Sequence, residues 1–228
     1  MPKPDYTLFL RALSGQECPR PTLFEPFIPR LLAEQLIWRR GPQLWDTPEH
    51  TADTMMSLRE RTQADVVIVD ARPYCMRSLF RLLCTLENGL CDGARAVLLS
   101  DRQEILREAE HSPAVCAVGG YGDTHPGNTP FLRMDKTAED ALSEGAAGYF
   151  AADNGLSLWE QYRGRLSVCG GLGADFCNTA SPVGLHTVLS DAFSVTRGAG
   201  FLPGSGGCMD ESAYLQLISL LGGVIRLR

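Results

Sequence analysis

The fold class is decided by the stretch Arg165-Leu-Ser-Val-Cys-Gly-Gly-Leu-Gly-Ala-Asp-Phe-Cys-Asn-Thr-Ala-Ser-Pro182. Its apolar start, residues 166–169, predicts a short buried strand. Glycines at positions 170, 171 and 173 follow, and they let the backbone approach a ligand closely or turn with a positive φ. Ser181-Pro182 then indicates the start of a helix. The stretch therefore predicts one strand–loop–helix unit of a parallel α/β fold, although a tight turn without a ligand explains the glycines equally well.

The composition sets outer limits on the class of protein. A chain of 228 residues is long enough to bury a real core, and we expect one domain over residues 1–228. The formal net charge of −6 argues against nucleic acid and anionic membrane surfaces as partners. Eight scattered cysteines without a Cys-x-x-Cys pair, together with an N-terminus that lacks a signal peptide's apolar core, predict a reduced, cytoplasmic protein.

The strand–loop–helix unit recurs along the chain. Its clearest strand is residues 64–71, whose four central residues are apolar and β-branched, as in a strand that is covered on both faces. Strands are also expected at 22–28, 94–100, 114–118, 146–151 and 199–202. Helices are expected at 6–14, 31–39, 47–61, 76–86, 101–110, 137–145, 156–162, 182–196 and 210–221.

This alternation of strands and helices predicts a parallel sheet. No Gly-x-Gly-x-x-Gly follows the first strand, which argues against a dinucleotide-binding Rossmann domain. We expect a TIM-like (β/α)8 barrel, shortened or incomplete, because 228 residues is close to the lower limit for that fold. An open three-layer sheet is the alternative.

Candidate site residues follow from this fold, because functional groups gather at the carboxyl ends of parallel strands. Asp70 and Asp123 are candidate general acids or bases, with Arg72 and Tyr121 as their charge or hydrogen-bond partners. Acids at strand ends are also common helix caps or solvated side chains, an alternative that applies above all to Asp153 and Asp175. The candidates for substrate binding are Glu25, Arg30, Asn128, Asp153, Gly170, Gly171 and Asp175.

Four segments carry a resemblance to a known family. They are Leu10-Arg-Ala-Leu-Ser-Gly-Gln-Glu-Cys-Pro-Arg-Pro-Thr22, His125-Pro-Gly-Asn-Thr-Pro-Phe-Leu132, Tyr162-Arg-Gly-Arg-Leu-Ser-Val-Cys-Gly-Gly-Leu-Gly173 and Ala199-Gly-Phe-Leu-Pro-Gly-Ser-Gly-Gly-Cys208. In this order they resemble motifs of the uroporphyrinogen decarboxylase superfamily, and its methyltransferase branch more closely than its decarboxylase branch. That superfamily includes the decarboxylase and the zinc-dependent methyltransferases that move methyl groups between corrinoid proteins and thiols.

The resemblance implies an enzyme with its site at the mouth of a barrel. The methyltransferase branch implies methyl transfer between a corrinoid and a thiol, with zinc held by His125 and Cys208, although Pro126 replaces the family's first cysteine. The decarboxylase branch implies decarboxylation of an acid whose acidic side chains are bound by an arginine-rich segment after the first strand. Here that segment offers Arg30, and Glu25 would repel a polycarboxylate, so we expect a small acid rather than uroporphyrinogen.

Two further expectations concern partners. The alternative to an enzyme is a barrel without catalysis that binds a corrinoid, a tetrapyrrole or a protein partner. In addition, a missing strand–helix unit would leave strand edges and apolar surface uncovered, and a second copy of the chain could cover them. A homodimer that completes the shortened barrel is therefore a third alternative.

Overall fold

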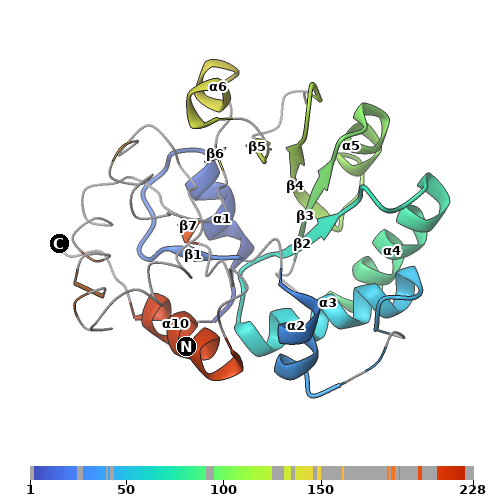
Figure 1. Ribbon diagram of the computed structural model, residues 1–228. Helices are drawn as coiled ribbons and strands as arrows, with labels where there is room; N and C mark the ends of the chain where they lie inside the picture. Colours follow the sequence, from blue (N-terminus) through green and yellow to red (C-terminus); the bar gives the residue numbers. More distant parts are fainter. Residues whose placement is uncertain are drawn as a thin grey trace.

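The computed structural model describes residues 3–24, 28–39, 41, 44–90, 95–124, 131–134, 137–145, 148–149, 161, 184, 186–187, 190, 200–201 and 210–223. Within these residues the chain is an α/β protein with parallel strands, and the longer helices lie to the outside of the strands (Figure 1).

The strands pair in the order of the chain. Five of them form one parallel sheet in the order β2-β3-β4-β5-β6, and β1 pairs with β7 in a separate parallel pair. The strands are β1 (Thr22–Leu23), β2 (Val67–Asp70), β3 (Ala96–Ser100), β4 (Val115–Gly120), β5 (Phe131–Arg133), β6 (Gly148–Tyr149) and β7 (Gly200–Phe201).

Local capping explains where several helices begin. The Thr47 side chain accepts a hydrogen bond from the backbone N–H of His50 at 3.1 Å, and Pro48 fills the first helical position of α3.

No helix in the described part of the chain is both long and apolar enough to cross a bilayer. The helices are α1 (Tyr6–Leu13), α2 (Arg30–Leu36), α3 (Pro48–Thr62), α4 (Met76–Gly89), α5 (Gln103–Ala109), α6 (Ala138–Ser143) and α10 (Glu211–Gly222).

The sheet is apolar on both faces, as the run at 64–71 predicts. Val67 and Val69 of β2 belong to a core cluster that also contains residues of α3, α4 and α5. Val66 and Ile68 belong to the cluster on the opposite face, together with residues of α1, α2 and α10. Because side chains alternate along a strand, the same strands supply two separate cores.

Helix α1 packs against strands of both sheets, β1 and β4. The guanidinium of Arg95, the residue before β3, lies 5.3 Å from the ring centroid of Tyr6 at the start of the helix. Phe9 of α1 packs edge-on against Phe24, which follows β1, with their ring centroids 5.1 Å apart. In the projection of Figure 1 the strands are drawn around α1.

Asp65 joins the N-terminal segment to the sheet. Its side chain has no exposed surface, and each carboxylate oxygen accepts two hydrogen bonds. Oδ1 accepts from the Asp5 backbone N–H at 2.7 Å and from Arg20 Nη2 at 2.8 Å. Oδ2 accepts from the Leu23 backbone N–H at 2.8 Å and from Arg20 Nη1 at 2.9 Å. One carboxylate therefore holds the start of α1, the start of β1 and the approach to β2 together.

The expected elements differ from the observed ones in a few places. β5 was not expected, and the strand predicted at 64–71 is shorter because the chain bends at Asp65. Asp101 was expected to begin a helix, but Arg102 occupies the N-cap position of α5. β4 continues through Gly119 and Gly120, which were assigned to the following loop. The strand predicted at 165–170 lies outside the described residues.

Replacing Asp65 by asparagine tests the buried ion pair. We expect Asp65→Asn to lower the free energy of unfolding by about 3–5 kcal/mol, because the Arg20 charge stays buried without its counter-charge. The measurement is urea denaturation followed by circular dichroism. The matched control is Arg81→Gln, which removes an exposed pair with Glu49 and should cost less than about 1 kcal/mol. Equal losses in the two variants would contradict this role of Asp65.

Candidate functional site

Asp70 and Arg72 form a tight ion pair at the carboxyl end of β2. Arg72 Nε donates to the two carboxylate oxygens at 2.9 and 3.1 Å, and Nη2 donates to Oδ2 at 2.6 Å. The backbone N–H of Arg72 also donates to Oδ1 at 3.1 Å. This pairing fixes the guanidinium along its Nε edge, and among the described residues no acceptor is bonded to Nη1.

Tyr121 brings the end of β4 to this pair. The guanidinium carbon of Arg72 lies 4.0 Å from the Tyr121 ring centroid, which is a cation–π contact. The tyrosine is 8% exposed, and its backbone N–H donates to the Ser100 carbonyl at the end of β3 at 3.1 Å. The ends of β2, β3 and β4 are therefore adjacent, and three of the four predicted catalytic residues lie in one cluster.

The electrostatics of the cluster keep Arg72 charged. The hydrogen bond to Asp70 raises the pKa of Arg72, and the negative charges of Asp70 and Asp101 act in the same direction. Desolvation works against this shift without reversing it. A guanidinium that is charged, oriented by a carboxylate and stacked on a ring is suited to bind a carboxylate or phosphate oxygen.

Arg102 holds the loop that carries Arg72. Its Nη2 donates to the Ala71 carbonyl at 3.2 Å and also to the Tyr74 carbonyl. Its backbone N–H donates to Ser100 Oγ at 3.1 Å, which ties the same residue to the end of β3. Arg102 therefore positions the loop between β2 and α4 from the neighbouring strand.

Arg133 holds the loop after β4 in a similar way. Its side chain is fully buried, and Nε donates to Glu144 at 2.7 Å. Nη1 donates to the Thr124 carbonyl at 2.9 Å, and Nη2 to the Gly122 carbonyl at 2.6 Å. Gly120 makes room for this arrangement, because a Cβ there would lie 2.9 Å from Arg133 Nη1. The loop next to Tyr121 is therefore fixed by a buried cation.

The other predicted site residues fall into two groups. Asp123 is exposed and lies two residues after Tyr121, whereas Arg30 is at the start of α2 and pairs with Glu34 at 2.9 Å. Nothing in the described contacts joins Arg30 to the Asp70–Arg72 pair. The remaining predicted residues lie outside the described residues: Glu25, His125, Asn128, Asp153, Gly170, Gly171, Asp175 and Cys208.

Metal-ligating side chains do not converge in the described part of the chain. No group of three or more His, Cys, Asp or Glu there is arranged to hold a metal ion. The zinc site implied by the resemblance depends on His125 and Cys208, so it stays a prediction. Arg102 and Arg133 are the residues near the cluster that the sequence did not predict, because their partners are mainly backbone carbonyls.

The comparisons with known proteins give no family. No protein-family model matches the chain, and no curated protein matches it.

Cys75 follows the loop between β2 and α4, and it differs from the buried cysteines in its exposure to solvent. It is exposed at the N-cap of α4, with Sγ 3.2 Å from Ser78 Oγ. The hydrogen bonds to Ser78, from its side chain first and its backbone next, lower the pKa of the Cys75 thiol. Burial has the opposite effect on Cys116 and raises the pKa of its thiol to about 12.

These opposite shifts predict different alkylation of the two thiols. At pH 8 iodoacetamide should modify Cys75 and leave Cys116 unmodified in the folded protein, because the thiolate is the nucleophile. The Cys75 rate should rise with pH, and Ser78→Ala should move its midpoint to higher pH. The measurement is peptide-resolved mass spectrometry over a pH series, with the urea-unfolded chain as the control for Cys116. Identical profiles for Cys75 in both proteins would contradict the role of Ser78.

Proposed function

We propose that this chain is a compact member of the uroporphyrinogen decarboxylase superfamily that binds and decarboxylates a small carboxylic acid. The observation that carries the proposal is the Arg72 guanidinium, held by Asp70 and stacked on Tyr121 at the carboxyl ends of parallel strands. The substrate carboxylate would bind to the Nη1 side of this guanidinium.

A closed, shortened barrel is part of the same proposal. Its support is that β2 to β6 pair in chain order and that β1 pairs with β7, the last described strand. The Asp65 backbone N–H also donates to the Leu23 carbonyl at 2.8 Å, which joins the approach to β2 to β1. In a barrel of this kind the ends of the strands would share one mouth.

The chemistry requires few groups. In decarboxylation the bond from the carboxylate carbon to its neighbour breaks and carbon dioxide leaves. The electron pair stays on the neighbouring carbon, so the substrate must carry a carbonyl or a conjugated ring there that delocalises it. A proton must then be added to that carbon. Arg72 would orient the carboxylate, and Asp123, which is exposed beside the cluster, would relay the proton from solvent.

Methyl transfer between a corrinoid and a thiol is the other reaction that the resemblance implies. Its zinc would be held by His125 and Cys208, so no described contact supports it. A barrel that binds its ligand without turnover is the alternative to an enzyme. Stoichiometric zinc that is lost in His125→Ala would move the proposal to methyl transfer, and binding of an acid without carbon dioxide release would move it to the binding protein.

Replacing Arg72 tests the proposed anion site. We expect Arg72→Gln to weaken the binding of propionate, malonate and benzoate at least tenfold, since a charge-assisted hydrogen bond contributes about 1.5–3 kcal/mol. Arg72→Lys should recover part of this loss, because lysine keeps the charge but not the fork. Isothermal titration calorimetry measures binding. The matched control is Arg77→Gln, which changes an exposed arginine on α4. Unchanged binding in Arg72→Gln would contradict the proposal.

A homodimer remains the proposal for the assembly. Two side chains of α2 and its C-terminal end, Leu31 and Trp38, are 76% and 77% exposed, and Phe80 of α4 is 69% exposed. Burial of such apolar surface between copies would be favourable. Sedimentation equilibrium at micromolar concentration should then give twice the chain mass, whereas a monomer at all concentrations would count against the dimer.

A further inference from the structure

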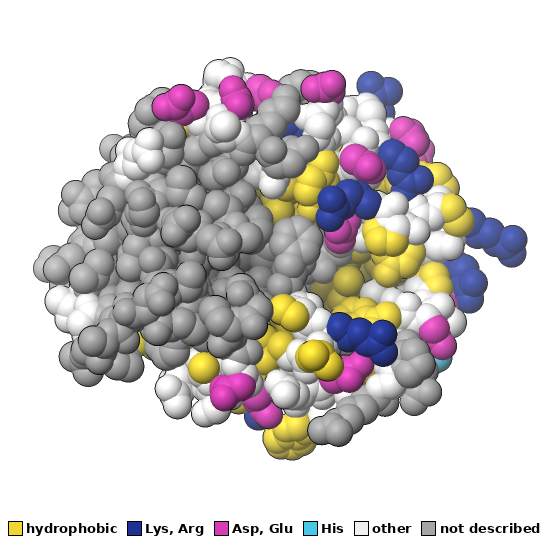
Figure 2. Space-filling model, viewed as in Figure 1, with side chains coloured by type: hydrophobic (Ala, Val, Ile, Leu, Met, Phe, Trp, Pro, Cys, Tyr) yellow, Lys and Arg dark blue, Asp and Glu magenta, His cyan; other side chains and the backbone are white. Residues whose placement is uncertain are grey.

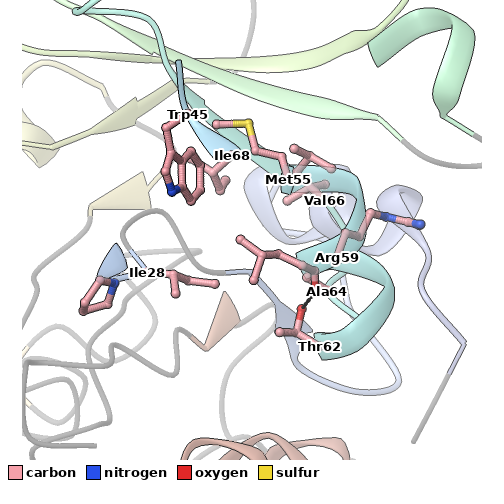
Figure 3. Close-up of a pocket in the computed structure, with 11 residues that line it drawn as sticks. Ile28, Trp45, Met55, Arg59, Thr62, Ala64, Val66 and Ile68 are labelled. Carbon is pink, nitrogen blue, oxygen red and sulfur yellow. Dashed lines mark hydrogen bonds between the residues drawn. The ribbon is translucent and has the colours of Figure 1, made fainter. Parts of the chain in front are cut away.

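A cavity of about 340 Å³ lies between α3 and β2 (Figure 3). Val66, Val67 and Ile68 all line it. Side chains alternate between the faces of a strand, so three consecutive residues share one cavity only where it runs along the strand edge. This is the edge of β2 that faces away from β3, since β2 is the first strand of the five-stranded order.

The lining of the cavity along β2 ends at Ile68, two residues before Asp70. Helix α3 runs back alongside β2, so its first half and the residue Trp45 before it lie at the carboxyl end of the strand. Trp45 and Ile68 are the lining residues nearest this end, whereas Thr62, Ala64 and Val66 line the cavity at the amino-terminal end of β2. Ile68 is two residues before Asp70, a rise of about 7 Å along a strand. The apolar cavity and the charged cluster are therefore neighbours on the same strand.

The lining is mainly apolar. Figure 3 shows Trp45, Ile28 and Met55 around the open space, whereas the guanidinium of Arg59 points away from Trp45 and Ile28. The Thr62 hydroxyl donates to the Leu58 carbonyl at 2.9 Å, so its polar group is already bonded. In Figure 2 apolar side chains line a hollow over α3 and β2, and charged side chains of both signs stand at its edge. The cavity therefore offers apolar contact with charge nearby.

We propose that the substrate is a carboxylic acid with an apolar tail, whose tail occupies this cavity while Arg72 binds the carboxylate. The inference rests on the proposed function and adds the substrate class to it. Benzene fills a cavity of about 150 Å³, so this one holds an alkyl or aryl tail of roughly eight carbons. Cavities of this size with apolar walls and a few polar groups at one end are typical ligand sites.

A homologous series of fatty acids tests the tail. We expect the full-length protein to bind each acid about fourfold more tightly for every methylene added from butyrate to octanoate. Each buried methylene contributes a constant increment to the binding free energy. Octanamide, which has the tail without the charge, should bind at least tenfold more weakly than octanoate. Calorimetry gives the affinities, and tryptophan fluorescence compared with Trp45→Phe reports occupancy next to Trp45.

Two variants fill the cavity from different elements. Ala64→Leu and Met55→Trp should keep the butyrate affinity and reduce the gain for each methylene below twofold. Leu83→Met, at a buried residue of α4 that does not line the cavity, is the matched control and should keep the full gain. Circular dichroism and the urea midpoint establish that each variant is folded. If one variant does not fold, the chain-length series in the wild-type protein still tests the inference.

The outcomes separate this inference from the proposed function. If acids bind and lose affinity in Arg72→Gln but show no dependence on tail length, the tail inference is wrong and the anion site stands. If octanoate and octanamide bind equally and Arg72→Gln changes nothing, the anion site is wrong and the inference falls with it. If no acid of the series binds at all, both are overturned.

Discussion

The buried carboxylate of Asp65 is the constraint on which the rest of the arrangement depends. It accepts four hydrogen bonds from three residues, including two from Arg20. A buried carboxylate without such partners would cost several kcal/mol, so the pairing selects one relative position for the segments that carry these residues. With that position fixed, β1 lies beside the approach to β2. The direction of β2 then determines where its carboxyl end lies.

Local patterns predicted the elements whose causes are local. The helix expected at 47–61 agrees with α3 because capping by Thr47 and the fixed φ of Pro48 act within a few residues. β5 was missed because it has three residues, one of them Arg133, and exists through its pairing with β4. Asp65 was taken for an ordinary strand residue, since its partner Arg20 is 45 positions away and no periodicity reveals it.

The candidate site was predictable to the same extent. Asp70, Arg72 and Tyr121 were expected because polar residues follow strands there, and strand ends converge in a parallel sheet. Arg102 and Arg133 were not expected, although they hold the two loops on which Arg72 and Tyr121 depend. A side chain that donates mainly to carbonyls leaves no pattern in the sequence, because every residue supplies a carbonyl.

Because the molecule carries a net negative charge, the fixed position of Arg72 matters more for the proposed binding of an anion. A net charge of −6 repels an anionic ligand at long range, but in physiological salt this repulsion is screened beyond about 8 Å. At contact distance a guanidinium in a partly desolvated site interacts far more strongly than in bulk water. Asp70 partly neutralises the charge of Arg72 and fixes the orientation of its side chain, which is 41% exposed. If Arg72 binds an anion as proposed, its fixed orientation would discriminate ligands by shape, and the apolar walls of the cavity would be the larger source of selectivity.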